Sequence, residues 1–199
     1  ARAQLRAQGL APLDVQAIEA SFRFLMLRHG QLSVVFGADE SGAVFQRRVP
    51  VPEQIVRVQD LSGFSGADRH ARLQDAMDGL VGTPFDLEHG PLLRVGLYRL
   101  GERGHVLGVA MHHIICDERS LAVLMQDFVT AYASYREGKA VDGLPALPLQ
   151  YEDYAVWQRQ WLEAGEAQAQ FILGAFYLYA QGVAQDVHQA IAYWQQAAA

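Results

Sequence analysis

The stretch AMHHIICDERSLAVLMQDF, from Ala110 to Phe128, is the part of the sequence that best indicates the fold. Its first residues end an apolar run with two adjacent histidines, His112 and His113, and Asp117 stands four residues after the second. From Ser120 onward, apolar residues recur at helical spacing. The stretch therefore predicts a β-strand that delivers the histidines to a turn, followed by a helix.

The two histidines are expected to play different roles. Successive side chains of a strand point to opposite faces, so His112 and His113 should diverge, one toward the body of the fold and one toward a cleft or solvent. An imidazole can act as a general base near neutral pH, because its unperturbed pKa is about 6.5. Asp117 could orient the loop, cap the helix or hold a basic partner. Spacing alone leaves a catalytic and a structural interpretation open.

The rest of the chain alternates helical and β-rich patterns. Apolar periodicity predicts helices over 14–29, 67–81, 120–136 and 151–162. β-rich runs bounded by turn residues predict strands over 32–36, 43–49, 54–61, 92–100 and 105–111. Helices gathered among mostly antiparallel strands favour an α+β sandwich.

The helix predicted at 151–162 carries an aromatic stripe. Tyr151, Tyr154, Trp157 and Trp161 follow one another at spacings of three and four, which places them on one helical face. We expect this stripe to pack in a core.

Composition restricts the classes of protein that fit. The chain has 199 residues, 51% hydrophobic content and a formal net charge of −6. It is long enough to bury a core as one domain, or as one domain with an appendage. Its basic residues are spread out, and no apolar run approaches the roughly 18 to 20 residues of a membrane span. We therefore expect no nucleic-acid partner and no membrane.

The reactive side chains outside the histidine pair give no further site. The single cysteine, Cys116, excludes an internal disulfide and fits a reducing compartment, so the cytoplasm is the expected location. We expect it to be a small buried side chain rather than a nucleophile. The other histidines lack a metal-ligand spacing such as HExxH, so no metal is predicted. The turns GADESG and GERG lack the lysine of a phosphate loop.

The segment HHIICDERS, from His112 to Ser120, closely resembles the HHxxxDG signature of condensation domains in nonribosomal peptide synthetases and of related CoA-dependent acyltransferases. Residues 84–100 and 147–162 resemble the segments before and after that signature, and residues 25–36 resemble an earlier RHExLRTxF-type motif. Together they cover residues 10–163 in the family's order.

This resemblance implies a chloramphenicol-acetyltransferase-like lobe, and a catalytic site in a tunnel between two such lobes. In that tunnel an amine on one carrier-bound phosphopantetheine attacks a thioester on another and forms an amide bond. The resemblance assigns His113 as the catalytic base or orienting partner, and His112 and Asp117 as structural members of the motif. The implied partners are peptidyl carrier proteins or domains, with no cofactor bound to this chain directly. Proximity of the two tethered substrates supplies much of such an acceleration.

Three departures from the family pattern concern this activity. The glycine after the aspartate is Glu118, a possible modulator that adds bulk and negative charge near the amine, and that would be strained by roughly 1–3 kcal/mol in a left-handed backbone. The earlier motif's arginine is Ser33 and its glutamate is Gly30, so Asp117 lacks a basic partner from that strand. Motifs of the second lobe are missing, so whether the chain is an enzyme is open, and alone it is expected to be inactive.

The C-terminal residues resemble a different unit. From Glu166 to Ala199 the sequence is similar to a Sel1-like repeat, a helix–turn–helix unit of α-solenoids that normally needs neighbours. We therefore expect a first-lobe domain at 1–163, and at 164–199 an α-helical hairpin that is a Sel1-like repeat or a helical extension of the first domain. The alternative to an acyltransferase is an inactive lobe that acts with this repeat as a protein-interaction module. Both ends are expected to continue into a longer protein.

Overall fold

The computed structural model describes residues 2–7, 13–102, 104–163, 171–172 and 187–197. The chain divides into two compact units, Ala1–Pro148 and Leu149–Ala199. Every described strand lies in the first unit, which therefore contains the sheet that carries the histidine pair.

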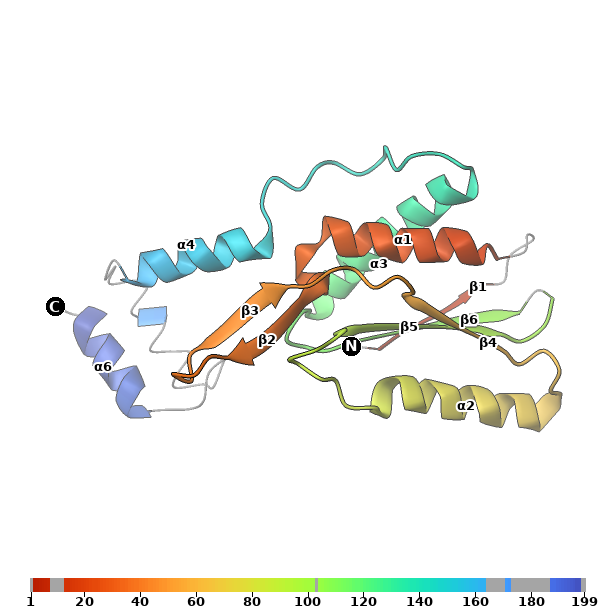
Figure 1. Cartoon of the computed structure of the whole chain (residues 1–199), viewed down its shortest axis with the longest axis horizontal. Helices are drawn as coiled ribbons and strands as arrows, with labels where there is room; N and C mark the ends of the chain where they lie inside the picture. The colour runs from red at the N-terminus through yellow and green to blue at the C-terminus, as the bar shows by residue number, and fades with distance from the viewer. Residues whose placement is uncertain (1, 8–12, 103, 164–170, 173–186, 198–199) are drawn as a thin grey trace. The chain divides into compact units, whose positions relative to one another are not determined.

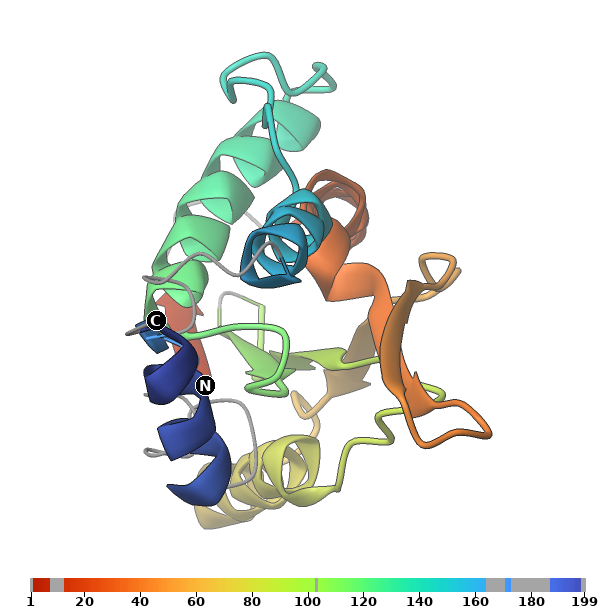
Figure 2. The same cartoon turned by 90° about the vertical axis from the view of Figure 1, so that its left-hand side faces the viewer.

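The first unit is built on a four-stranded sheet with a separate two-stranded hairpin beside it (Figure 2). The strands are β1 (Arg2–Ala7), β2 (Val34–Ala38), β3 (Val44–Arg48), β4 (Val56–Asp60), β5 (Leu93–Arg99) and β6 (His105–Met111). The larger sheet has the order β1-β6-β5-β4, and β2 pairs with β3. β4 runs parallel to β5, and the other pairs are antiparallel.

Helices cover both faces of the larger sheet (Figure 1). The helices α1 (Val15–Arg28) and α3 (Glu118–Arg136) lie together on one face, and α2 (Gly66–Gly82) lies on the other. Between α1, α3 and the sheet, the rings of Phe22 and Phe128 lie 4.9 Å apart in the main core. A Cβ on Gly108 of β6 would lie only 2.8 Å from Met77 Sδ, so this glycine allows α2 to approach the sheet closely.

The first helix shows how local sequence sets these elements. Asp14 caps α1, since its carboxylate accepts a hydrogen bond of 3.0 Å from the amide of Ala17. The apolar residues Ile18, Phe22 and Leu25 are buried on one face. The helix ends at Arg28 and passes into a 3₁₀ turn at Gly30–Ser33. The helix predicted over 14–29 is therefore confirmed to within one residue at each end.

Most predicted elements are found, and one observed strand was not predicted. The predicted α+β class is confirmed by helices on a mostly antiparallel sheet. β1 pairs with β6 from Arg2↔Ala110 to Ala7↔His105. Its sequence, RAQLRA, has neither β-branched nor aromatic residues, so only its pairing with β6 makes it a strand.

The second unit contains the helices α4 (Tyr151–Glu163) and α6 (Val187–Ala197). Along α4 each aromatic ring contacts the next: the two pairs that include Tyr154 are tilted, and Trp157 and Trp161 are stacked with ring centroids 5.6 Å apart. Tyr151, Tyr154 and Trp157 are nevertheless exposed, so the predicted core role of this stripe is not found in the described part of the chain. Most of the Sel1-like resemblance, including residues 173–186, lies outside the described residues.

Candidate functional site

The histidine pair directly follows the last residue of β6, as predicted. β6 ends at Met111, which pairs with Leu93 of β5. The amide of His112 then donates a hydrogen bond of 3.0 Å to the carbonyl of Leu92, which continues the ladder by one step. α3 begins at Glu118, so residues 112–117 form the turn between strand and helix. We call residues 112–117 the histidine turn.

His112 is built into this turn. Its ring is half-buried, and its Nδ1 accepts a hydrogen bond of 3.1 Å from the amide of Ile114. Its carbonyl accepts a hydrogen bond of 3.1 Å from the amide of Ile115. An amide N–H can only donate, so Nδ1 must be unprotonated in this geometry, and the ring is the neutral Nε2–H tautomer. His112 thus closes the turn with both its side chain and its backbone.

His113 is the exposed member of the pair. The two histidines therefore differ in burial, but both lie in the turn after β6, so strand alternation does not account for the difference. The ring of His112 uses its Nδ1 within the turn, and the ring of His113 lies at the surface. The structure thus leaves the side chain of His113 accessible at the surface.

Asp117 caps α3. Its Oδ1 accepts hydrogen bonds from the amide and the hydroxyl of Ser120, at 2.7 and 2.6 Å. Its backbone is extended, with φ −120° and ψ −173°, as an N-cap requires. These bonds, with a smaller contribution from the charge of Arg119, lower the pKa of Asp117 below its ordinary value. Of the three roles that spacing left open, the structure shows the helix cap.

The departures from the family motif have local explanations. Glu118 is the first residue of α3, so its backbone is helical, and the strain that a left-handed conformation would impose does not arise. Ser33 is buried, and its hydroxyl donates a hydrogen bond of 3.2 Å to the carbonyl of Met26. At Gly30, an added Cβ would collide with the guanidinium of Arg48 from β3. The absence of a side chain at residue 30 therefore makes room for Arg48.

An ion pair that sequence reasoning missed joins α1 to α3. Asp127 is only 7% exposed, and its Oδ2 accepts from Arg28 Nε at 2.9 Å and from His29 Nε2 at 2.8 Å. The signal in the sequence was an aspartate between Leu124 and Phe128, on the buried face of the helix. A carboxylate there needs a buried partner, because an unpaired charge is costly to bury.

The other side chains to consider are the thiol of Cys116 and the residue types that bind metals. Cys116 is buried, and burial raises the pKa of its thiol, which disfavours the thiolate. Within the described residues, no group of three or more His, Cys, Asp or Glu side chains is arranged to hold a metal ion. None of the described helices has the length and apolar character needed to cross a membrane.

Curated relatives are large peptide synthetases. One of the linear gramicidin synthase proteins of Brevibacillus parabrevis is 40% identical over 152 residues, which cover 76% of this chain and 2% of that protein. The cyclosporin synthetase of Tolypocladium inflatum is 37% identical over 169 residues, 83% of this chain and 1% of that protein. The chain thus spans a few per cent of the length of the curated relatives that it matches.

Solved structures share the fold. The X-domain from teicoplanin biosynthesis matches with a TM-score of 0.72 at 30% identity, over 89% of this chain and 38% of that chain. The first condensation domain of the calcium-dependent antibiotic synthetase, in complex with a substrate analogue, matches with a TM-score of 0.69 at 26% identity, over 90% of this chain and 41% of that chain. The family model described as Condensation domain matches residues 5–171. The chain therefore belongs to the condensation-domain family.

Proposed function

We propose that this chain is the N-terminal lobe of a condensation-type acyltransferase in a nonribosomal peptide synthetase. Its substrates are an amine and a thioester, each carried on the phosphopantetheine of a peptidyl carrier protein or domain. The amine nitrogen attacks the thioester carbonyl, the C–N bond forms and the C–S bond breaks. The thiolate leaves, and the proton that the amine loses passes to it. The phosphopantetheine belongs to the carriers and is not a cofactor of this chain.

The observation that carries this proposal is the exposed His113 on a turn held by His112 and Asp117. In the proposed reaction His113 accepts the amine proton, or orients the amine by a hydrogen bond. His112 and Asp117 keep the turn in place and do not touch the substrates. Holding two tethered substrates together contributes a large share of the acceleration, so His113 need not supply it alone.

The test uses a full-length protein that carries this chain together with a second lobe. With aminoacyl carrier substrates, His113→Ala is expected to lower the rate of amide formation about 100-fold, the range that general acid–base catalysis contributes. His70→Ala, on the exposed surface of α2, is the matched control and should leave the rate unchanged. An unchanged rate in His113→Ala would show that this histidine does not have the proposed role.

The 199-residue chain alone is expected to form no peptide product, because it supplies one wall of the expected tunnel. Mass spectrometry of the carrier-bound products tests this. A product that disappears in His113→Ala would contradict the need for a second lobe.

A protein-interaction module is the second candidate. One observation favours it: an X-domain that is 28% identical to this chain, with a TM-score of 0.73, was solved as a complex with OxyB, so a relative of this fold binds a protein partner. In this version Glu118 and Ser33 mark an inactive lobe. A full-length protein that binds carriers but makes no amide, with or without His113, would favour this candidate over the acyltransferase.

The C-terminal residues belong to the same proposal. We infer that residues 1–163 form the lobe and that residues 164–199 are a Sel1-like repeat that binds a protein, or a helical extension of the lobe. Deleting residues 164–199 separates these alternatives. If residues 164–199 are a repeat, their deletion should leave the thermal stability of the lobe unchanged. If they are an extension of the lobe, their deletion should lower its thermal stability. We also expect the parent to act in the cytoplasm, where a reducing medium keeps Cys116 a thiol.

A further inference from the structure

A cation and an aromatic ring are packed together next to the histidine turn. The guanidinium of Arg94, on β5, lies 3.9 Å from the ring centroid of Phe85. Arg94 also donates two hydrogen bonds to the loop that precedes β5, to the carbonyls of Thr83 at 2.6 Å and Pro84 at 2.7 Å. One arginine thus fixes both the backbone and the aromatic side chain of this loop.

The ring of Phe85 in turn contacts His112. The two rings meet edge to face, with centroids 5.8 Å apart and an angle of 81° between their planes. This contact lies beside the hydrogen bond from Ile114 to Nδ1, which depends on the orientation of the imidazole. A continuous series of contacts therefore runs from Arg94 to Phe85, to His112 and to the turn that holds His113.

We propose that Arg94 and Phe85 are positioning residues, which hold the ring of His112 where its Nδ1 accepts from Ile114 and so set the place of His113. Neither residue touches a substrate. The catalytic consequence rests on the function proposed above, whereas the effect on His112 does not. Aligning a reacting group is worth a large factor in rate, since a misplacement of about 1 Å can cost about 100-fold.

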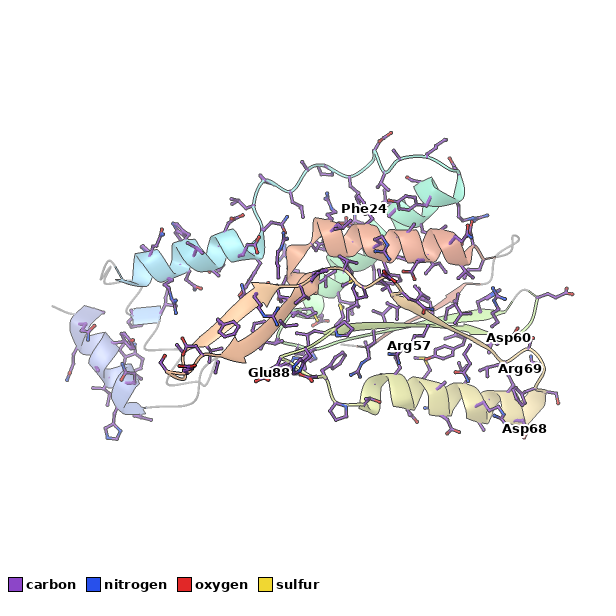
Figure 3. The ribbon with its side chains drawn as sticks, in the orientation of Figure 1. Phe24, Arg57, Asp60, Asp68, Arg69 and Glu88 are labelled. Carbon is purple, nitrogen blue, oxygen red and sulfur yellow. The ribbon has the colours of Figure 1, made fainter. Side chains whose placement is uncertain are left out.

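Electrostatics supports a positioning role for Arg94. The register pairs Arg57 of β4 with Gly96, two residues from Arg94 on the same face of the sheet, and Arg57 extends from the sheet toward α2 (Figure 3). Burial, followed by the charge of Arg57, lowers the pKa of Arg94. Burial and the neighbouring positive charge thus disfavour the charged guanidinium of Arg94. Its hydrogen bonds to the loop carbonyls and its contact with the ring of Phe85 offset this cost.

The chain supplies a matched control for this pair. Arg72 lies over the ring of Phe64 at the same distance, 3.9 Å. Phe64 begins the segment that leads into α2, close to Arg69, whose guanidinium donates to the Phe64 carbonyl. Figure 3 shows Asp60, Asp68 and Arg69 at this end of the sheet, and Glu88, in the loop that contains Phe85, at the other end. The control pair is thus of the same kind but remote from His112.

The first test is nuclear magnetic resonance on the whole 199-residue chain. The ring-nitrogen shifts of His112 report its tautomer, and the exchange rate of the Ile114 amide reports the bond to Nδ1. Phe85→Leu and Arg94→Lys are expected to mix the two tautomers and to speed Ile114 exchange at least about tenfold. Phe64→Leu and Arg72→Lys should leave both signals unchanged, although they lose the same kind of contact.

The free energy of unfolding of each variant is measured in parallel, so that a general loss of stability is distinguished from a local effect on His112. Phe85→Tyr keeps the ring and should keep the tautomer and exchange signals of the wild type. Wild-type signals in Phe85→Leu and Arg94→Lys, or equal changes in the control pair, would overturn the proposal.

The second test measures kinetics in the full-length two-lobed protein. Phe85→Leu should lower kcat about tenfold with little change in the KM for carrier substrates, since alignment and not binding is altered. Phe85→Tyr should restore the rate. If the wild type makes no amide while the His112 signals respond as expected, the acyltransferase function fails and the positioning role stands. If kcat is normal in a variant whose His112 signals have changed, the positioning of His113 is overturned.

Discussion

Helix α3 is held by two aspartates in two very different surroundings. Asp117, at its first turn, is exposed and accepts from the amide and hydroxyl of Ser120. Asp127, further along the helix, is buried and accepts from Arg28 and His29 of the α1 end. The first contact is local in the sequence, whereas the second joins residues 98 and 99 positions apart.

The two aspartates therefore have different roles: Asp117 shapes a turn, and Asp127 joins two helices. Water competes for an exposed carboxylate, so Asp117 mainly determines where the histidine turn stops and the helix begins. At Asp127 a missing partner would leave an unpaired charge in the core, so the ion pair contributes to the α1–α3 contact beside the apolar packing of Phe22 and Phe128. We therefore expect the buried contact to dominate stability and the exposed one to dominate the local geometry of the site.

The largest effect is expected from Asp127→Ala. Removing the acceptor leaves Arg28 and His29 without their shared carboxylate, which should lower the free energy of unfolding by about 3–5 kcal/mol. Urea titration followed by circular dichroism measures it. Glu137→Ala, which removes the exposed ion pair with Lys139 near the end of α3, is the control and should change little. Equal losses in the two variants would remove the distinction between buried and exposed carboxylates.

The next effect concerns the pH dependence of the Asp117 cap. The bonds from Ser120 lower the pKa of Asp117 below its ordinary value of 3.8, so the folded state favours the carboxylate. The resulting stability is present above the unfolded-state pKa and is lost as the pH falls through the lower folded-state value. Asp117→Asn can still cap but does not titrate. Its melting temperature should therefore approach that of the wild type as the pH falls below about 4. A difference that stays constant from neutral to acidic pH would contradict this.

A smaller effect is expected at Glu118, beside the cap. A carboxylate in the first turn interacts favourably with the helix dipole, so Glu118→Gln should lose about 0.5 kcal/mol of stability, and Glu118→Gly about 1 kcal/mol more. In the full-length two-lobed protein we expect the opposite order for the rate. Glu118→Gly should speed amide formation, and Glu118→Gln should recover only the part that is due to charge. If neither variant changes the rate, Glu118 does not reach the substrates, and its departure from the motif is neutral.

The smallest effect is expected at Gly30, next to the partners of Asp127. A methyl group there would displace the guanidinium of Arg48, which is the far end of a long and exposed side chain. Gly30→Ala should therefore cost less than about 1 kcal/mol. In an Arg48→Ala background the same substitution should cost nothing, so the two effects are non-additive. Additive effects in this double-mutant cycle would show that Gly30 is required for another reason.

Local patterns predicted the elements whose signals lie within one segment. Apolar periodicity predicted α1, whose buried face carries Ile18, Phe22 and Leu25. Alternation and turn residues predicted the β5–β6 hairpin, and with it the place of His112 and His113 at the strand's end. These features depend on neighbours within a few residues, and so the sequence alone contains them.

Contacts between distant segments could not be predicted in the same way. β1 has a weak strand pattern and is a strand because β6 offers it an edge. The partners of Asp127 lie on another helix, and no spacing rule connects them. The contact between Phe85 and His112 joins a loop to a strand end through the pairing of β5 with β6. The core role expected for the aromatic stripe of α4 is not found among the described residues, and helical spacing shows a shared face but not what covers it.

By itself the sequence determined the order of helices and strands, the position of the histidine pair after a strand and the resemblance to condensation domains. Each of these depends on side-chain type and on short-range backbone preference, which neighbouring residues largely fix. The tertiary structure decided that His112 is half-buried and His113 exposed, that Asp117 caps α3, and that Asp127 joins two helices. Those outcomes depend on burial and on hydrogen-bond partners, which exist only once distant segments have packed together.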